Sequence, residues 1–336
     1  MRGGAEVLAE GLRRVLVGAG HQAEIVAIPF KGYPPERILD QMLACRLLDL
    51  TETAGMPVDR LIGLKFPAYL IPHPDKVTWM LHQHRQAYDL WQHPLGDLHP
   101  YANGADVRTV IHAADTKLLP QSRGLFTISR NVTLRLKTYC GLNATTLYHP
   151  PRDAGRFYTR PAENFLYFPS RINPLKRQNL VLEALAQTRS QVRICFSVPA
   201  EEPGLERKCA ELARRNGVEN RVQWLGAVSE EEKLDLYARS LGVLFPPLDE
   251  DYGYITLEAM LARKAVITCA DSGGPLEFVV HRDTGIIAEP TPESLAAAMD
   301  DLWDDRERAR QWGDAGRQRY SDLRIDWGNV IENLLQ

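Results

Sequence analysis

Glu250 and Glu258, separated by seven residues, form the pair whose types and spacing say most about chemistry. A glycine turn at Gly253 lies between them, and residues 256–262 continue with a helical pattern. Glycine lets a backbone approach a ligand closely, and a helix N-terminus offers N–H groups to an anion. One carboxylate therefore lies before a loop and the other about one turn inside a helix. Such a pair can accept hydrogen bonds from two hydroxyl-bearing parts of one ligand, and a sugar plus a ribose is the simplest interpretation.

Two cations precede this motif in the same half of the chain. Arg171 comes just after the apolar run Phe165–Pro169, and Lys176 follows five residues later, before a helical pattern. Arginine can bind a phosphate through two parallel hydrogen bonds, while lysine adds a compact point charge. Two solvated surface cations are the alternative interpretation. The glutamate pair farther along the same domain favours a common anion site.

A third loop has a similar character. Ser272, Gly273 and Gly274 follow the apolar run Ala265–Cys269, and we expect them to open a helix. All three loops come after predicted strands, and the carboxyl ends of parallel strands meet at one edge of a sheet. The sequence therefore predicts that they contribute to a single ligand site.

Strand-like and helix-like segments alternate along nearly the whole chain, which is typical of doubly wound parallel sheets. The α/β fold class then implies two Rossmann-like domains around a central cleft. We place the first domain at residues 1–150, the second at 151–320, and a C-terminal helix returning toward the first domain at 321–336. The expected strands are residues 23–29, 60–65, 76–81, 125–129 and 145–148 in the first domain, and 165–169, 192–197, 221–225, 243–245, 265–269 and 285–288 in the second.

The predicted order begins unusually. A doubly wound domain normally begins with a strand, yet the first predicted element here is a helix near residues 5–19, preceded by Gly3 and Gly4. We therefore expect the first strand of the N-terminal domain to be missing from this chain. A later start codon or a fragment would explain such a beginning.

Composition excludes several classes of protein. The net charge of −3 argues against nucleic acid as the main partner, because no basic excess is present to neutralise phosphates. The five cysteines are scattered without a Cys-x-x-Cys pair, which predicts reduced thiols and a cytoplasmic location. No apolar stretch reaches the roughly 18 to 20 residues that span a bilayer, and the N-terminus lacks the apolar region of a signal peptide.

The combination of these motifs resembles the family-4 retaining glycosyltransferases, which have the two-domain GT-B fold. The resemblance rests on Gly3-Gly4, Arg171 with Lys176, Glu250-x7-Glu258 and Ser272-Gly273-Gly274. It covers nearly the whole chain and is strongest over residues 165–290. It implies a hexosyltransferase whose C-terminal domain binds a nucleotide-diphosphate sugar and whose N-terminal domain presents a glycan or lipid-linked acceptor. Synthesis of a cell-surface polysaccharide or glycolipid is the expected setting.

The resemblance also implies roles for individual residues. Arg171 and Lys176 would bind the diphosphate, Glu258 the ribose hydroxyls, and Glu250 a hydroxyl of the transferred sugar. Backbone amides at Gly253, Tyr254 and Ile255 would face the sugar and phosphates. The remaining donor-binding positions would be Gly226 and Val228 along the base, and Gly3 and Gly4 from the opposite domain.

Histidines and acidic residues offer two further candidates. His82 follows the apolar run 76–81, where the resemblance places a histidine near the transferred sugar; a structural histidine is the equally weighted alternative. His84 is the second choice. Asp249 and Asp251 form an Asp-x-Asp pattern that binds a divalent metal in another glycosyltransferase fold. We nevertheless predict no metal and no cofactor, because Arg171 and Lys176 already supply positive charge.

Several alternatives stay open. The basic segment Ser129–Lys137 is interpreted either as a solvated helix face or as a peripheral contact with the inner face of a membrane. A nucleotide-sugar epimerase can share the two-domain fold, and a truncated, non-catalytic nucleotide-binding protein is also compatible with the sequence. A dinucleotide-dependent dehydrogenase is disfavoured, since no Gly-x-Gly-x-x-Gly follows a predicted strand.

Overall fold

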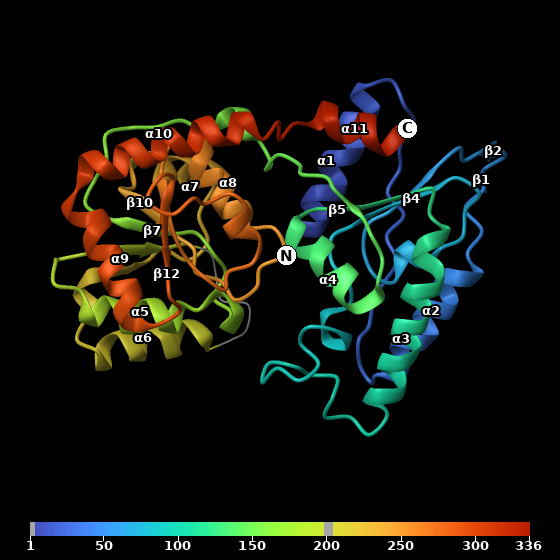
Figure 1. Ribbon diagram of the computed structural model, residues 1–336, viewed down its shortest axis with the longest axis horizontal. Coiled ribbons are helices and arrows are strands. Elements are labelled where there is room, and N and C mark those ends of the chain that lie inside the picture. The colour runs from blue at the N-terminus through green and yellow to red at the C-terminus, as the bar shows by residue number, and fades with distance from the viewer. Residues whose placement is uncertain (1–3, 198–203) are drawn as a thin grey trace. The chain divides into compact units, whose positions relative to one another are not determined.

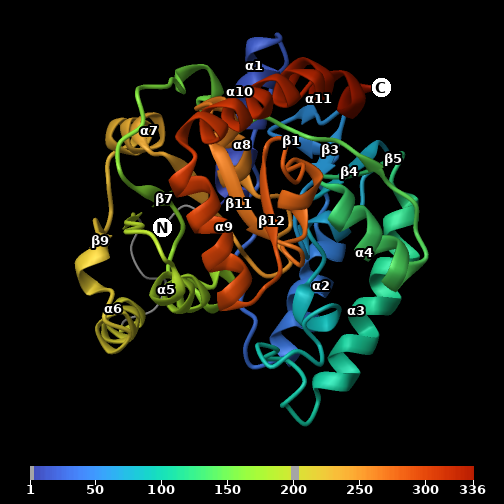
Figure 2. The same cartoon turned by 60° about the vertical axis from the view of Figure 1, so that its left-hand side comes forward.

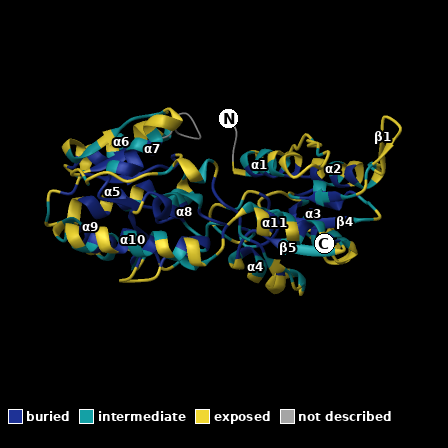
Figure 3. Cartoon of the chain, turned by 90° about the horizontal axis from the view of Figure 1, so that it is seen from above, coloured by how far each residue is buried: buried dark blue, intermediate teal, exposed yellow. Residues whose placement is uncertain are grey.

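The computed structural model describes residues 4–197 and 204–336. The chain divides into two compact units (Figure 1). Unit 1 comprises the chain up to Arg152 together with Asp326–Gln336, and unit 2 comprises Asp153–Ile325. Buried residues gather at the centre of each unit, and exposed residues lie along the outer helix faces and loops (Figure 3).

A parallel four-stranded sheet forms the centre of unit 1, with the order β3-β4-β5-β6. All five residues of β4 are buried, as expected for a strand covered on both faces. Within it, Trp79 is fully buried and its indole N–H donates to the Leu147 carbonyl at 3.2 Å. The four strands are β3 (Leu61–Gly63), β4 (Lys76–Met80), β5 (Gly124–Thr127) and β6 (Thr145–Thr146). Four of the five strands expected in this domain are therefore present, with shifted ends.

The helices of unit 1 follow their sequence signals closely. In α4, Ser129 caps the first turn by accepting from the Val132 N–H at 3.0 Å, and Gly141 ends the helix at φ 67°. The first described element is α1. The helices are α1 (Gly4–Gly18), α2 (Glu36–Leu47), α3 (Gly104–Leu118), α4 (Arg130–Cys140) and α11 (Trp327–Leu335).

The strand expected at residues 23–29 is absent, and this prediction was wrong. The segment is irregular, with Ile25 and Val26 40% and 55% exposed. A strand needs a hydrogen-bonded neighbour, and in the described sheet β3 pairs with β4 alone. An unpredicted hairpin of β1 (Glu52–Thr53) and β2 (Met56–Pro57) lies farther along, turning through Ala54 and Gly55 at φ 49° and 79°.

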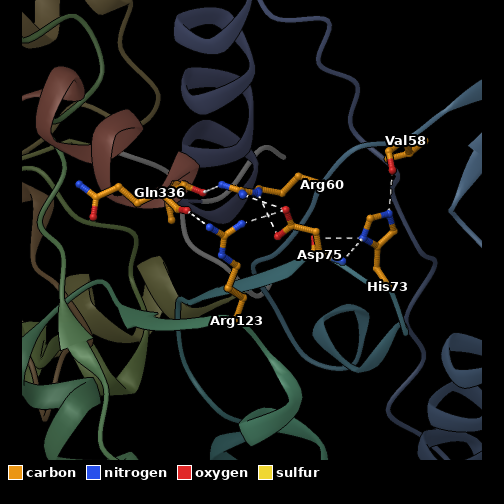
Figure 4. A network of polar contacts seen from close by, with 7 residues as sticks. Val58, Arg60, His73, Asp75, Arg123 and Gln336 are labelled. Atoms are coloured by element: carbon orange, nitrogen blue, oxygen red, sulfur yellow. Dashed lines mark hydrogen bonds and ion pairs between the residues drawn. The ribbon is translucent and has the colours of Figure 1, made fainter.

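Polar contacts join α11 to the sheet of unit 1 (Figure 4). The Arg60 guanidinium donates to the Leu334 carbonyl at 2.9 Å and to Asp75 at 2.8 Å. Arg123 bonds to both Asp75 and the Gln336 carbonyl. A carboxylate shared by two arginines thus fixes the end of the helix beside β4, since charge-assisted hydrogen bonds are the stronger kind.

A buried carboxylate on α3 accepts hydrogen bonds from the segments that follow β3 and β4. Asp115 is fully buried and accepts from the Tyr69 hydroxyl at 3.0 Å and from the Tyr88 hydroxyl at 2.8 Å. His112 stacks on the Tyr88 ring, and Cys140 lies 3.7 Å from the Tyr88 hydroxyl. Burial raises the pKa of Asp115 to about 7, although both tyrosine hydrogen bonds lower it.

Asp115→Asn should remove a pH dependence from the stability of unit 1. The folded carboxyl, with its pKa of about 7, keeps a proton that the unfolded chain releases near its ordinary value of 3.8. The free energy of unfolding therefore falls as pH rises between those values, by on the order of 4 kcal/mol. The neutral variant should gain that much relative to the wild type between pH 4 and 8. Native-state hydrogen exchange of the β4 amides measures the difference, and a constant difference across this range would contradict the assignment.

Unit 2 has a six-stranded parallel sheet with the order β9-β8-β7-β10-β11-β12. Side chains alternate between its faces, so that Leu166 and Phe168 belong to one buried cluster and Tyr167 to the other. All six strands predicted for this domain are present. They are β7 (Leu166–Phe168), β8 (Ile194–Phe196), β9 (Val222–Trp224), β10 (Gly242–Leu244), β11 (Ala265–Cys269) and β12 (Gly285–Ala288).

Helices cover both faces of this sheet (Figure 2). Residues of α5 and α9 enter the first cluster, and residues of α7 and α8 enter the second. The expected helix after Ser272 is only a 3₁₀ turn, η7 (Gly274–Glu277). The helices are α5 (Gln178–Gln187), α6 (Leu205–Arg215), α7 (Glu230–Arg239), α8 (Tyr254–Leu261), α9 (Pro292–Asp304) and α10 (Arg306–Asp322).

Candidate functional site

The strand order of unit 2 creates a topological switch point between β7 and β10. The chain proceeds outward from β7 through β8 to β9, then returns to β10 on the other side of β7. Open α/β sheets bind ligands in the crevice at the carboxyl ends of such a pair, because the two connections leave in opposite directions. Residues 169–177 follow β7 and residues 245–253 follow β10. These segments hold Arg171, Lys176 and Glu250.

Backbone hydrogen bonds join the loops that follow β7, β10 and β11. The Leu248 N–H donates to the Leu175 carbonyl at 2.7 Å, and the Glu250 N–H donates to the Ser272 carbonyl at 2.9 Å. The Gly274 N–H returns a bond to the Glu250 carbonyl at 2.8 Å. The three loops predicted to share a site are therefore in direct contact, with Glu250 in the middle.

Two glycines allow these loops to come so close. A methyl group on Gly274 would lie 2.6 Å from the Tyr252 carbonyl oxygen, which is closer than Cβ contacts occur. At Gly253 the backbone has φ 87°, a conformation that glycine adopts without the cost of a side chain. In this structure the close approach at Gly274 is thus between two protein backbones, a use that the sequence pattern alone did not reveal.

Lys176 and Glu250 form an ion pair at the switch point. The Lys176 ammonium group also lies 5.4 Å above the Phe245 ring, and its side chain is 17% exposed. Arg171 comes from the same loop and is exposed; Gln178 donates to its carbonyl at 2.8 Å and fixes the local backbone. A phosphate and a neighbouring hydroxyl of one ligand would meet a cation and a carboxylate that already lie in contact.

A second ion pair supports this arrangement, and sequence reasoning missed it. Both terminal nitrogens of Arg177 donate to the Asp271 carboxylate, at 2.7 and 2.6 Å. Such a two-point contact is rigid and joins the loop after β7 to the loop after β11. The available signals were the basic pair Lys176-Arg177 and the acidic residue just before Ser272.

Glu258 lies in the second turn of α8 and is 12% exposed. Its carboxylate accepts from the Lys233 ammonium at 3.3 Å and from the Tyr237 hydroxyl at 2.7 Å, both on α7. The helix begins at Tyr254, so Gly253, Tyr254 and Ile255 lie at its N-terminal end. Backbone N–H groups and the helix dipole favour an anion there.

The loop between β9 and α7 contains the two residues predicted to line a base. Gly226 has φ 62°, which a turn requires, and Val228 packs against the cluster that includes Tyr237. Ser229 then caps α7 by accepting from the Glu232 N–H at 3.1 Å. The loop therefore leads directly into the helix that contacts Glu258.

Four predicted positions lie in unit 1 or outside the described residues. His82 follows β4, is half-buried, and its Nδ1 lies 2.6 Å from the Gln83 carbonyl oxygen. His84 packs between Phe30 and Phe66, and burial lowers its pKa to about 4, so this ring is neutral. Gly4 is the exposed first residue of α1. Gly3 lies outside the described residues.

Neither a metal cluster nor a membrane-spanning helix is found in residues 4–197 and 204–336. No three histidine, cysteine or acidic side chains in these ranges gather as metal ligands would. In the same ranges, no helix is both long and apolar enough to cross a bilayer. In the basic helix α4, Arg135 is buried, while Arg130, Leu134 and Lys137 are exposed. All five cysteines are free thiols.

Comparison with known proteins gives a consistent picture. Residues 156–319 match the family model of glycosyl transferases group 1. The α-1,3/1,6-mannosyltransferase ALG2 of Dictyostelium discoideum is 36% identical over 110 residues, which are 33% of this chain and 26% of that protein. The chain therefore spans about a quarter of this curated relative.

Solved structures agree over nearly the whole chain. Sucrose-phosphate synthase from Thermosynechococcus elongatus aligns with a TM-score of 0.75 and 17% identity, over 99% of this chain and 92% of that one. HepE of Anabaena in complex with UDP-glucose aligns with a TM-score of 0.69 and 18% identity, over 100% and 95%. These likenesses establish the fold, two parallel-sheet domains of the GT-B kind. The family match covers residues 156–319, nearly the whole of unit 2, and this unit is therefore a domain of the glycosyl transferases group 1 family.

Proposed function

We propose that this protein transfers a hexose from a nucleotide-diphosphate donor to a glycan or lipid-linked acceptor, with retention at the anomeric carbon. The observation that carries the proposal is the Lys176–Glu250 pair at the switch point, within the region that matches the family. Arg171 comes from the same loop as Lys176 and adds a second positive charge. Together they supply what the reaction needs where a diphosphate departs.

The proposed roles follow the chemistry of each side chain. Arg171 and Lys176 bind the diphosphate, and the start of α8 at Gly253, Tyr254 and Ile255 adds N–H groups. Glu250 accepts a hydrogen bond from the transferred sugar, while Glu258 accepts from the ribose hydroxyls. The bond between the anomeric carbon and the phosphate oxygen breaks, and the acceptor oxygen bonds to that carbon on the same face. The leaving diphosphate takes the acceptor proton, so no nucleophilic side chain is required.

In this proposal unit 1 binds the acceptor, and His82 is its candidate catalytic side chain. An acceptor that belongs to a glycolipid or a cell-surface polysaccharide is consistent with the relatives, which include an O-antigen chain mannosyltransferase of Escherichia coli. The exposed Arg130 and Lys137 of α4 would favour an anionic membrane surface that holds such an acceptor.

A donor panel tests the function. UDP-, GDP- and ADP-hexoses are incubated with the protein, with and without glycan or polyprenyl-linked sugar acceptors, and with and without EDTA. We expect release of nucleoside diphosphate that depends on the acceptor, a retained anomeric configuration by NMR, and no effect of EDTA. Isomerised donor without transfer would identify an epimerase. Nucleotide binding without turnover would identify a non-catalytic binder, and loss of activity in EDTA that Mg²⁺ or Mn²⁺ restores would refute the metal-free mechanism.

A further inference from the structure

Helix α7 contacts Glu258 through two side chains that the motifs do not include. Lys233 and Tyr237 lie one helical turn apart on α7, and both side chains contact Glu258 of α8. The Lys233 ammonium donates to Oε1 of Glu258 at 3.3 Å, and the Tyr237 hydroxyl donates to Oε2 at 2.7 Å. One donor is thus assigned to each carboxylate oxygen.

Lys233 and Tyr237 use only part of the hydrogen-bond acceptor capacity of the Glu258 carboxylate. An ionised carboxylate has about four acceptor sites, two on each oxygen. Lys233 and Tyr237 use one site on each oxygen. One acceptor site on each oxygen then remains for a ligand, which suits two neighbouring hydroxyl groups that donate side by side. The 2′ and 3′ hydroxyls of a ribose are such a pair.

Packing fixes both donors. Tyr237 is fully buried, with its ring against Tyr167 at 5.0 Å and against Phe157 at 5.6 Å between ring centroids. Burial raises the pKa of its hydroxyl well above the ordinary value, so this group stays a donor. Burial lowers the pKa of Lys233, but the Glu258 and Glu230 carboxylates more than offset this and raise it overall.

We infer that Lys233 and Tyr237 are positioning residues that hold the Glu258 carboxylate in the orientation that recognises the ribose diol of the donor. The inference rests on the proposed function, because it needs a nucleotide at Glu258. Helix α7 starts just after the Gly226–Val228 loop, so it also couples the proposed base-binding loop to the ribose. A rigid acceptor pair loses little freedom when it binds, which favours the ribose over its deoxy counterpart.

The test compares ribose with deoxyribose in matched variants. Tyr237→Phe removes one hydroxyl and keeps the buried ring, while Lys233→Met removes the charge and keeps the stem. Calorimetry first finds which of UDP, GDP and ADP binds the wild type, and then measures that nucleotide and its 2′-deoxy form. The wild type should bind the deoxy form about ten- to a hundredfold more weakly. Each variant should lose about tenfold for the ribonucleotide and little for the deoxynucleotide.

The outcomes separate this inference from the proposed function. Glu230→Gln serves as the control, because Glu230 is the other, 48% exposed partner of Lys233 and should leave the ribose preference unchanged. A preference that survives in both variants, or equal losses for both nucleotides, would overturn the positioning role alone. Failure of the wild type to bind any of the three nucleotides would overturn the proposed function together with it.

Discussion

Lys176→Ala and Arg171→Ala should each lower the turnover number of sugar transfer by about 10²- to 10³-fold. Each substitution removes one cation from the place where the diphosphate develops negative charge as it leaves. A fixed donor at such a position typically lowers the activation barrier by about 3 to 4 kcal/mol. The side chain that Lys176 contacts, Glu250, is 25% exposed, so water can solvate the carboxylate left behind. The fold should therefore survive, and steady-state kinetics with saturating acceptor measures the effect.

Lys208→Ala is a suitable control for the two cation variants. Lys208 is an exposed cation on α6 in the same unit and belongs to none of the three loops that meet at the switch point. Its loss changes the net charge by the same amount and should leave turnover within about twofold of the wild type. Near-normal transfer by both Lys176→Ala and Arg171→Ala would refute their assignment to the diphosphate.

Glu258→Gln should weaken the binding of the preferred nucleoside diphosphate by about 10²-fold. Hydrogen bonds to a charged acceptor contribute about 1.5 to 3 kcal/mol each, and a neutral amide offers one acceptor oxygen where the carboxylate has two. The amide nitrogen would also face the ammonium group of Lys233 or the hydroxyl of Tyr237, which are donors themselves. Isothermal titration calorimetry gives the dissociation constant directly.

The control for this variant is Glu206→Gln, an exposed carboxylate at the first turn of α6. It changes the charge equally and should bind the nucleotide as the wild type does. If Glu258→Gln bound the nucleotide with unchanged affinity, Glu258 would have no part in holding the ribose. The acidic motif would then stabilise the contact between α7 and α8.

The fold of unit 2 could be predicted from the sequence because its strands are continuous apolar runs. β11 is such a run, buried along its whole length, and its predicted and observed ends agree. The prediction that the cations and Glu250 share one site also follows from order alone, since the loops after β7 and β10 meet at the switch point. The direct ion pair between Lys176 and Glu250 could not be predicted from order and is seen only in the structure.

Other features depend on partners that a pattern does not show. Residues 23–29 have the apolar character of a strand, but strand formation is decided by a neighbour with which to pair. In the sequence, Lys233 and Tyr237 are part of an ordinary amphipathic helix pattern. Their contacts with Glu258 depend on the packing of α7 on α8, which that pattern does not predict. The Arg177–Asp271 pair joins residues 94 positions apart in the chain, a separation that local pattern cannot bridge.

A crystal structure of the protein with its preferred nucleoside diphosphate tests the central claim most directly. The account predicts the phosphates within hydrogen-bonding distance of Lys176 and Arg171, and the ribose hydroxyls on the Glu258 carboxylate, in the crevice between the loops after β7 and β10. A nucleotide bound elsewhere, for example in the hollow of about 600 Å³ that β12 and α9 line with Arg282 and Asp301, would contradict it.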